Sequence, residues 1–169
     1  ILPCLWVLMI GIMLWHIRAE RRRKPTDGRL GYDDRLTLDD DGGSYQPVPR
    51  EVEALQGRKV TSVACGDRHT AVVLDDGTLY TFGDGAYGQL GHGDTQEQAS
   101  PKRVELSSAF VTGVAFSSSC ASAWTHGGRV YCWGVGAAHG ELGLGGGAPA
   151  VHNDVLLPQE VGGLPGGGW

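Results

Sequence analysis

The 169-residue sequence lacks the charge balance and the sequence signals that mark nucleic-acid-binding or glycosylated proteins. It has no basic excess, because 14 Lys and Arg stand against 19 Asp and Glu, and the formal net charge is −5. An acidic chain offers no general positive surface for phosphates, which argues against a nucleic-acid partner. The only asparagine, Asn153, is followed by Asp154 and Val155 and is not a glycosylation acceptor.

Cysteines are few and scattered. The four cysteines form no C-x-x-C pair and no spacing suited to zinc; they are Cys4, Cys65, Cys120 and Cys132. A disulfide pairing stays open, although no spacing requires one, and a reducing compartment fits best. We therefore expect no metal site and no cofactor.

Formal charge is absent from the first 17 residues, Ile1–Ile17, which are mostly apolar. As a helix this segment would cover roughly 25 Å, close to the ~30 Å of a bilayer core. Five basic residues follow within Arg18–Lys24, and Trp6 and Trp15 lie toward either end of the segment. This pattern predicts a transmembrane helix over residues 1–17 in a single-pass membrane protein, with the rest of the chain on the cytosolic side.

Other interpretations of the N-terminal segment stay open. It could be a signal peptide whose basic region is missing, a buried helix, or mistranslated or mis-spliced sequence. The basic cluster could also be a nuclear localisation signal. Without a genuine anchor, the localisation would be cytoplasmic or nuclear. Because the chain begins at Ile1 rather than Met, we expect it to be a fragment of a longer protein.

Residues 18–48 continue the basic cluster into a polar segment. From Pro25 to Pro47 the sequence shows little apolar periodicity and includes three consecutive aspartates, Asp39–Asp41. Such a composition predicts a disordered, solvated linker.

Glycine is abundant, at 28 residues, and occurs within an internal repeat. Four blocks recur in the same order in two units. Pro49-Arg-Glu-Val52 recurs as Pro101-Lys-Arg-Val104 and again as Pro158-Gln-Glu-Val161; Val60–Ala64 matches Val111–Ala115; Asp76–Gly83 matches Gly127–Gly134; Gly88–Gly91 matches Gly140–Gly143. A period near 50 residues indicates one supersecondary unit per repeat.

Each unit contains short alternating apolar runs separated by turn residues. In the first unit the pattern predicts strands over Val60–Cys65, Thr70–Leu74 and Leu79–Phe82, with a tight turn at Asp75–Gly77. With about four strands per unit, the period is typical of propeller blades. The proline that opens each unit can be accommodated at a strand start or on an exposed edge.

The motif order P-x-x-V, V-x-x-V-A-x-G-x-x-H-T, D-G-x-L-Y-x-F-G and G-Q-L-G resembles the repeat of the regulator of chromosome condensation family. The resemblance covers residues 49–162 and implies a propeller that is usually closed by seven blades. We expect an all-β fold, a partial β-propeller of about two blades, preceded by the N-terminal apolar helix. Repeat one would be residues 49–100, repeat two 101–157, and 158–169 the start of a third. The second unit departs from the pattern at Ser117–Ala121 and has an insertion at Gly145–Gly147.

The residues that carry the resemblance are expected to be structural. They are Gly66, His69, Gly77, Tyr80, Phe82, Gly83, Gly88, Leu90, Gly91, Gly128, Tyr131, Trp133, Gly134, Gly140, Leu142 and Gly143. His69 is interpreted as a buried histidine that bonds to the backbone rather than as a general base. The segment Gly83–Gly88 has the form G-x-G-x-x-G, but the glycine-rich sequence after it predicts no helix, which a dinucleotide site needs. No catalytic residue is expected.

The function that fits these observations is a non-enzymatic protein-interaction scaffold, held at a membrane if residues 1–17 are an anchor. The alternative is a guanine-nucleotide exchange factor for a small GTPase, an activity that the resemblance implies. The partner would accordingly be an unidentified protein, with a small GTPase as one candidate. Function in such folds is carried by loops on a common scaffold.

Overall fold

The computed structural model describes residues 28–31, 37–38, 44–45, 49–106, 109–136, 140–145 and 154–162. Apart from the 3-10 helix η1 (Glu53–Leu55), the elements in this part of the chain are β-strands. Two of them, β1 (Thr37–Leu38) and β2 (Ser44–Tyr45), form a short antiparallel pair. The other eight form two four-stranded sheets, which confirms the all-β prediction.

The first sheet is an antiparallel meander in the order β3-β4-β5-β6. Its strands are β3 (Val60–Cys65), β4 (His69–Leu74), β5 (Leu79–Gly83) and β6 (Gln98–Arg103). Between β4 and β5, Gly77 takes a φ of +77°, a conformation that a residue with a Cβ rarely adopts. The Asp76 carboxylate accepts hydrogen bonds from the backbone N–H and the hydroxyl of Thr78. The turn thus has the chemistry that Asp-Gly predicts.

The second sheet repeats this arrangement in the order β7-β8-β9-β10. Its strands are β7 (Val111–Phe116), β8 (Cys120–Thr125), β9 (Val130–Val135) and β10 (Asp154–Glu160). The three strands predicted in the first unit are confirmed to within one residue at each end.

The fourth strand of each sheet lies at its outer edge and contains the proline of the P-x-x-V motif. Pro101 lies within β6 and Pro158 lies within β10, next to an irregular stretch of the β9–β10 pairing. An edge position accommodates proline because the missing N–H removes no interior ladder bond. Each sheet therefore begins inside one sequence unit and ends inside the next.

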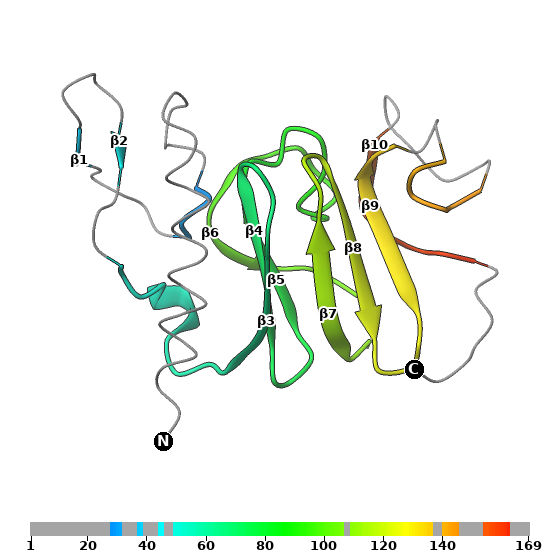
Figure 1. Cartoon of the computed structure of the whole chain (residues 1–169), viewed down its shortest axis with the longest axis horizontal. Helices are drawn as coiled ribbons and strands as arrows, with labels where there is room; N and C mark the ends of the chain where they lie inside the picture. Colours follow the sequence, from blue (N-terminus) through cyan, green and yellow to red (C-terminus); the bar gives the residue numbers. More distant parts are fainter. Residues whose placement is uncertain are drawn as a thin grey trace.

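The main core lies between the two sheets, which stand side by side in Figure 1 with β3 and β4 against β7. The first sheet contributes Ala71, Val73 and Leu79, all at most 1% exposed. The second sheet contributes the buried residues Val111, Val114, Ala121, Ala123, Tyr131, Trp133 and Val155, and the β9–β10 connection contributes Leu142. Neither sheet could bury this face without the other, so the pair is the smallest unit that makes this core.

The predicted membrane helix over Ile1–Ile17 lies outside the described residues. In the part of the chain that the structure describes, no helix is long and apolar enough to span a bilayer. This finding contradicts the single-pass membrane localisation and its cytosolic orientation, and we withdraw both. The physical reason is that the described backbone forms its hydrogen bonds between strands, and its one helix spans three residues.

Candidate functional site

The turn Gly88–Gly91 lies in the β5–β6 connection of the first sheet and contacts the second sheet. Its Gln89 is buried, and the carbonyl oxygen of Gln89 accepts a hydrogen bond of 2.8 Å from the indole Nε1 of Trp133. A methyl group added to Gly91, whose φ is +75°, would lie 2.8 Å from that same nitrogen. One added to Gly88 would lie 2.5 Å from Leu156 in β10. The G-Q-L-G motif is therefore an inter-sheet contact in which glycine permits close packing.

A second turn of the same kind lies inside the segment that we expected to be a disordered linker. Gly28 and Gly31 have φ of +66° and +77°, and a methyl on Gly31 would lie 2.9 Å from the ring of Phe82. The Thr70 hydroxyl donates a 2.9 Å hydrogen bond to the Arg29 carbonyl, and the buried Arg29 guanidinium donates to the Asp67 carbonyl at 3.0 Å. Residues 28–31 thus contact the first sheet as residues 88–91 contact the second.

The third such turn, Gly140–Gly143, has the same backbone form without the same contacts. Gly140 and Gly143 have φ of +74° and +65°. A methyl on Gly140 would meet nothing within 4 Å, and one on Gly143 would meet only Val161, at 3.4 Å. Among the described residues, no sheet follows the second one to cover this turn.

The histidines have separate environments. His69 is buried at the start of β4, and its ring meets Phe116 of β7 edge-on with centroids 4.2 Å apart. Cys120 occupies the equivalent place in the second sheet, with its Sγ 2.9 Å from the Ser117 Oγ. His126 is exposed, and His16, His139 and His152 lie outside the described residues. The burial of His69 fits a structural role, and its expected backbone bonding stays a prediction.

His92 is a partly buried histidine whose pKa the fold shifts. Its Nε2 lies 3.0 Å from the Thr81 hydroxyl, which itself donates to the Leu90 carbonyl at 2.7 Å. Because that hydroxyl proton is already used, Nε2–H is the donor to Thr81. Burial, assisted by the nearby Lys102 ammonium, lowers the pKa of His92 from 6.5 to about 4, against the opposing effects of Thr81 and Asp94. His92 is therefore neutral near pH 7.

The remaining repeat positions lie in strands and turns of the two sheets. Phe82 and Trp133 occupy equivalent places on β5 and β9, and both are buried. Gly83–Gly88 runs from β5 into turns, and the next element is the strand β6 rather than a helix. In the described part of the chain, Cys65, Cys120 and Cys132 are free thiols, and no group of His, Cys, Asp and Glu could hold a metal ion.

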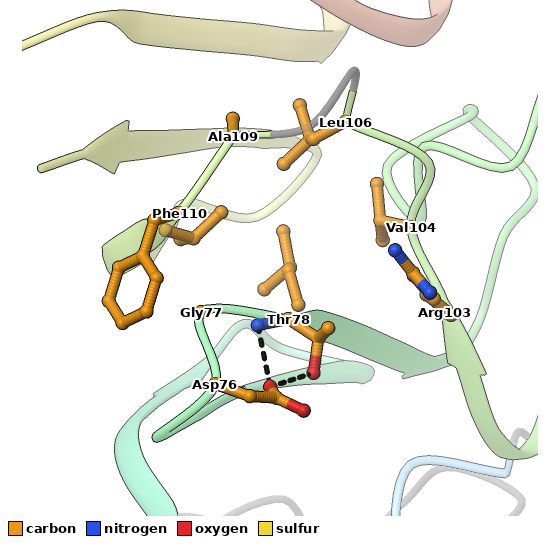
Figure 2. A pocket seen from close by; sticks show the side chains of 10 residues that line it. Asp76, Gly77, Thr78, Arg103, Val104, Leu106, Ala109 and Phe110 are labelled. Atoms are coloured by element: carbon orange, nitrogen blue, oxygen red, sulfur yellow. Dashed lines mark hydrogen bonds between the residues drawn. The ribbon is translucent and has the colours of Figure 1, made fainter. Parts of the chain in front are cut away.

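A hollow of about 220 Å³ opens where β4–β5 and the β6–β7 connection meet. We call it the Phe110 hollow; Figure 2 shows Phe110 on one side, Arg103 on the other, and Asp76 and Thr78 below. It is lined by Asp76, Gly77, Thr78, Leu79, Arg103, Val104, Leu106, Ala109, Phe110 and Val111. Sequence reasoning missed it, because Thr78 and Arg103 are variable positions of the motif and Leu106, Ala109 and Phe110 lie between its blocks.

Phe110 is the exposed apolar residue of this hollow. Its side chain is 50% exposed, and a methyl on Gly77 would lie 2.6 Å from its ring. The Val111 N–H donates to the Gly77 carbonyl at 3.0 Å, which ties the first strand of the second sheet to the turn of the first. The hollow therefore has a rigid floor and one large apolar side chain at its rim.

The profile of the regulator of chromosome condensation (RCC1) repeat matches residues 25–73 and 76–124, together more than half of the chain, and a second profile of the same description matches 60–89. The chain belongs to the regulator of chromosome condensation repeat family. The first match of this RCC1 repeat begins at residue 25 and so includes the turn at residues 28–31.

Curated relatives with RCC1-like sequence are far longer than this chain. The probable E3 ubiquitin-protein ligase HERC4 of Mus musculus is 39% identical over 112 residues, 65% of this chain and 10% of its own length. The E3 ubiquitin-protein ligase HERC2 of Homo sapiens is 39% identical over 145 residues, 84% of this chain and 3% of its own. The ultraviolet-B receptor UVR8 of Arabidopsis thaliana is 38% identical over 119 residues, 70% of this chain and 25% of its own. The chain thus spans a quarter or less of these relatives.

Solved structures share the RCC1 fold. Human WBSCR16 superposes with a TM-score of 0.64 at 25% identity, covering 81% of this chain and 33% of that one. Prp20p of Saccharomyces cerevisiae, whose reported structure concerns its binding to Gsp1p and histones, superposes with a TM-score of 0.61 at 20% identity, covering 82% and 33%. At 20% identity, this second likeness shows the fold alone.

The inter-sheet turn can be tested by comparing two glycines with the same φ. Both Gly91→Ala and Gly140→Ala introduce left-handed strain of about 1–2 kcal/mol, but only the former drives a methyl into Trp133. We expect Gly91→Ala to lower the free energy of unfolding by about 1–3 kcal/mol more than Gly140→Ala, from overpacking. Urea unfolding followed by circular dichroism measures both. Equal losses would show that the close packing at Gly91 contributes nothing.

The pKa of His92 predicts a pH-dependent stability. Below about pH 6.5 the unfolded chain binds a proton at His92 that the folded chain does not bind until about pH 4. The free energy of unfolding should therefore fall as the pH decreases through this window, and His92→Gln should make the fall shallower. Thermal melts across the window test this, with the exposed His126→Gln as control. A slope that is the same in the unsubstituted chain and in His92→Gln would contradict it.

Proposed function

We propose that this chain is a non-enzymatic protein-interaction module, in which the two RCC1 sheets are a rigid support for the Phe110 hollow. The observation that carries the proposal is an exposed aromatic side chain, Phe110, at the rim of a hollow that both polar and apolar residues line. Aromatic residues are enriched in the central part of interfaces between proteins, which makes Phe110 a suitable contact for a protein partner. The net charge of −5 supports a protein rather than a nucleic acid as partner.

The relatives support a scaffold rather than one shared reaction. RCC1-like sequence occurs in proteins named as ubiquitin ligases and in a protein named as an ultraviolet-B receptor. Because the same repeat serves proteins with such different names, the repeat itself does not set one chemistry. A common role in binding other proteins accounts for its use in all of them.

Photo-crosslinking from position 110 tests the proposal directly. We replace Phe110 with the photoreactive amino acid benzoylphenylalanine in the full chain and irradiate cells that express it. Tyr87 is the matched control, because it is an equally exposed aromatic residue outside the hollow, at 52% against 50%. We expect discrete adducts with other proteins from position 110 and not from position 87. Equal labelling from both positions, or none from either, would refute a binding role for the hollow.

An exchange factor for a small GTPase makes a different prediction. Exchange requires a surface that binds the GTPase better without its nucleotide than with it, and so needs extensive contact around the nucleotide site. In the described residues, the Phe110 hollow has a volume of about 220 Å³, which is enough for one side chain but not for such an extensive contact. We expect no acceleration of fluorescent-nucleotide release from a panel of small GTPases. Reproducible release above the intrinsic rate would replace the scaffold proposal with the exchange factor.

A further inference from the structure

The size of the Phe110 hollow limits what can occupy it. At about 220 Å³ it is smaller than the ~300–1,000 Å³ typical of sites for small molecules and cofactors. A hollow of this volume also cannot accommodate a helix, whose diameter with side chains is about 10–12 Å. A single large side chain from an extended segment fits this volume.

The apolar residues at the floor of the hollow are already buried by the fold. Leu79, Val104 and Val111 are each at most 2% exposed, and Leu106 is 9% exposed. Two backbone hydrogen bonds hold the walls together, from the Val104 N–H to the Leu79 carbonyl and from the Val111 N–H to the Gly77 carbonyl. An incoming aliphatic or aromatic side chain would therefore contact mainly Phe110 at the rim, and the backbone groups in these two hydrogen bonds would stay satisfied.

The acidic group at the rim is already neutralised. The Asp76 carboxylate accepts two hydrogen bonds from Thr78 and pairs with the Arg58 guanidinium at 2.9 Å. The hydrogen bonds from Thr78, assisted by Arg58, hold the pKa of Asp76 below its usual value. Asp76 therefore contributes little attraction for a positively charged partner.

The basic group on the opposite rim is available for a partner. The nearest carboxylate to Arg103 is that of Glu105, whose Oε1 lies 3.9 Å from Nε, with side chains 55% and 81% exposed. An exposed pair of this kind is weak, so exchanging Glu105 for an incoming carboxylate has little energetic penalty. A guanidinium can hold a carboxylate through two parallel hydrogen bonds.

This arrangement is particular to the first sheet. In the sequence repeat, Arg103 corresponds to Glu160 and Asp76 corresponds to Gly127. The charge on this rim is therefore reversed in the second unit. The basic character of the rim is not a requirement of the fold.

We infer that the Phe110 hollow binds an extended segment of a partner protein that places one apolar side chain against Phe110 and an adjacent aspartate or glutamate against Arg103. The inference rests on the proposed function, since it names the chemistry of the partner at that same site. The apolar side chain is buried against Phe110, which is half exposed without a partner. The carboxylate gives specificity, because Arg103 favours apolar segments that carry an adjacent negative charge.

A charge reversal tests the inference. A phage-displayed library of random linear peptides is selected on the immobilised full chain, on Arg103→Glu, and on Arg129→Glu as control. Arg129 is matched because it is an exposed arginine, 61%, with a glutamate at 4.0 Å. We expect peptides with an apolar residue beside Asp or Glu from the unsubstituted chain and from Arg129→Glu, and Lys or Arg in place of the acid from Arg103→Glu.

Affinities of the selected peptides give a second readout. Arg103→Gln should lower the affinity for an acidic peptide by about threefold to tenfold, which is the effect of losing one exposed charge-assisted contact. Phe110→Ser should weaken it further, and circular dichroism confirms that each variant is folded. The inference would be overturned by peptides that bind Arg103→Glu and Phe110→Ser as tightly as they bind the unsubstituted chain. A selection that yields no peptides would also overturn it. If crosslinking from position 110 still captures a protein in that case, the proposed function stands and only the chemistry of its partner is wrong.

Discussion

The contact of a glycine turn with an aromatic ring of the next sheet is the interaction on which the rest of this structure depends. Trp133 donates to the Gln89 carbonyl while Gly91 lies against its indole, and Phe82 lies under Gly31 in the same way. Each four-stranded sheet has apolar side chains on both faces and cannot bury them alone. The turn fixes which faces meet, because the hydrogen bond is made in one relative position of the sheets.

That constraint also explains where function can lie in this family. Several residues of the repeat are buried in the packing of the two sheets, among them His69, Phe82 and Trp133. Such residues are unavailable to a partner. A binding site must then use positions that the repeat leaves variable, and Phe110 and Arg103 are of this kind. The corresponding residues in the other unit are Lys59 and Glu160.

The second sheet illustrates how one substitution is accommodated within the repeat. Trp124 stands where the first unit has Val73, which is fully buried between the sheets. The indole of Trp124 lies over Gly113, where a methyl group would come within 2.1 Å of the ring, and the side chain is 43% exposed. The same sequence position is therefore a core residue in one sheet and a surface residue in the other, because only the first sheet has a neighbour on that side in the described part of the chain.

The sequence by itself determined the strands, the tight turn at Asp76 and Gly77, and the repeat, because alternation and glycine conformation are local properties. It also determined which aromatic positions are equivalent. It did not determine that residues 28–31 belong to a repeat-like turn, since Gly28-Arg-Leu-Gly31 lies in polar sequence and takes its meaning from contacts with Thr70 and Phe82. The N-terminal apolar run suggested a membrane protein from composition alone, and that localisation was wrong. Only the tertiary structure decided the Phe110 hollow, because its walls are brought together by hydrogen bonds between residues more than twenty positions apart, such as Gly77 and Val111.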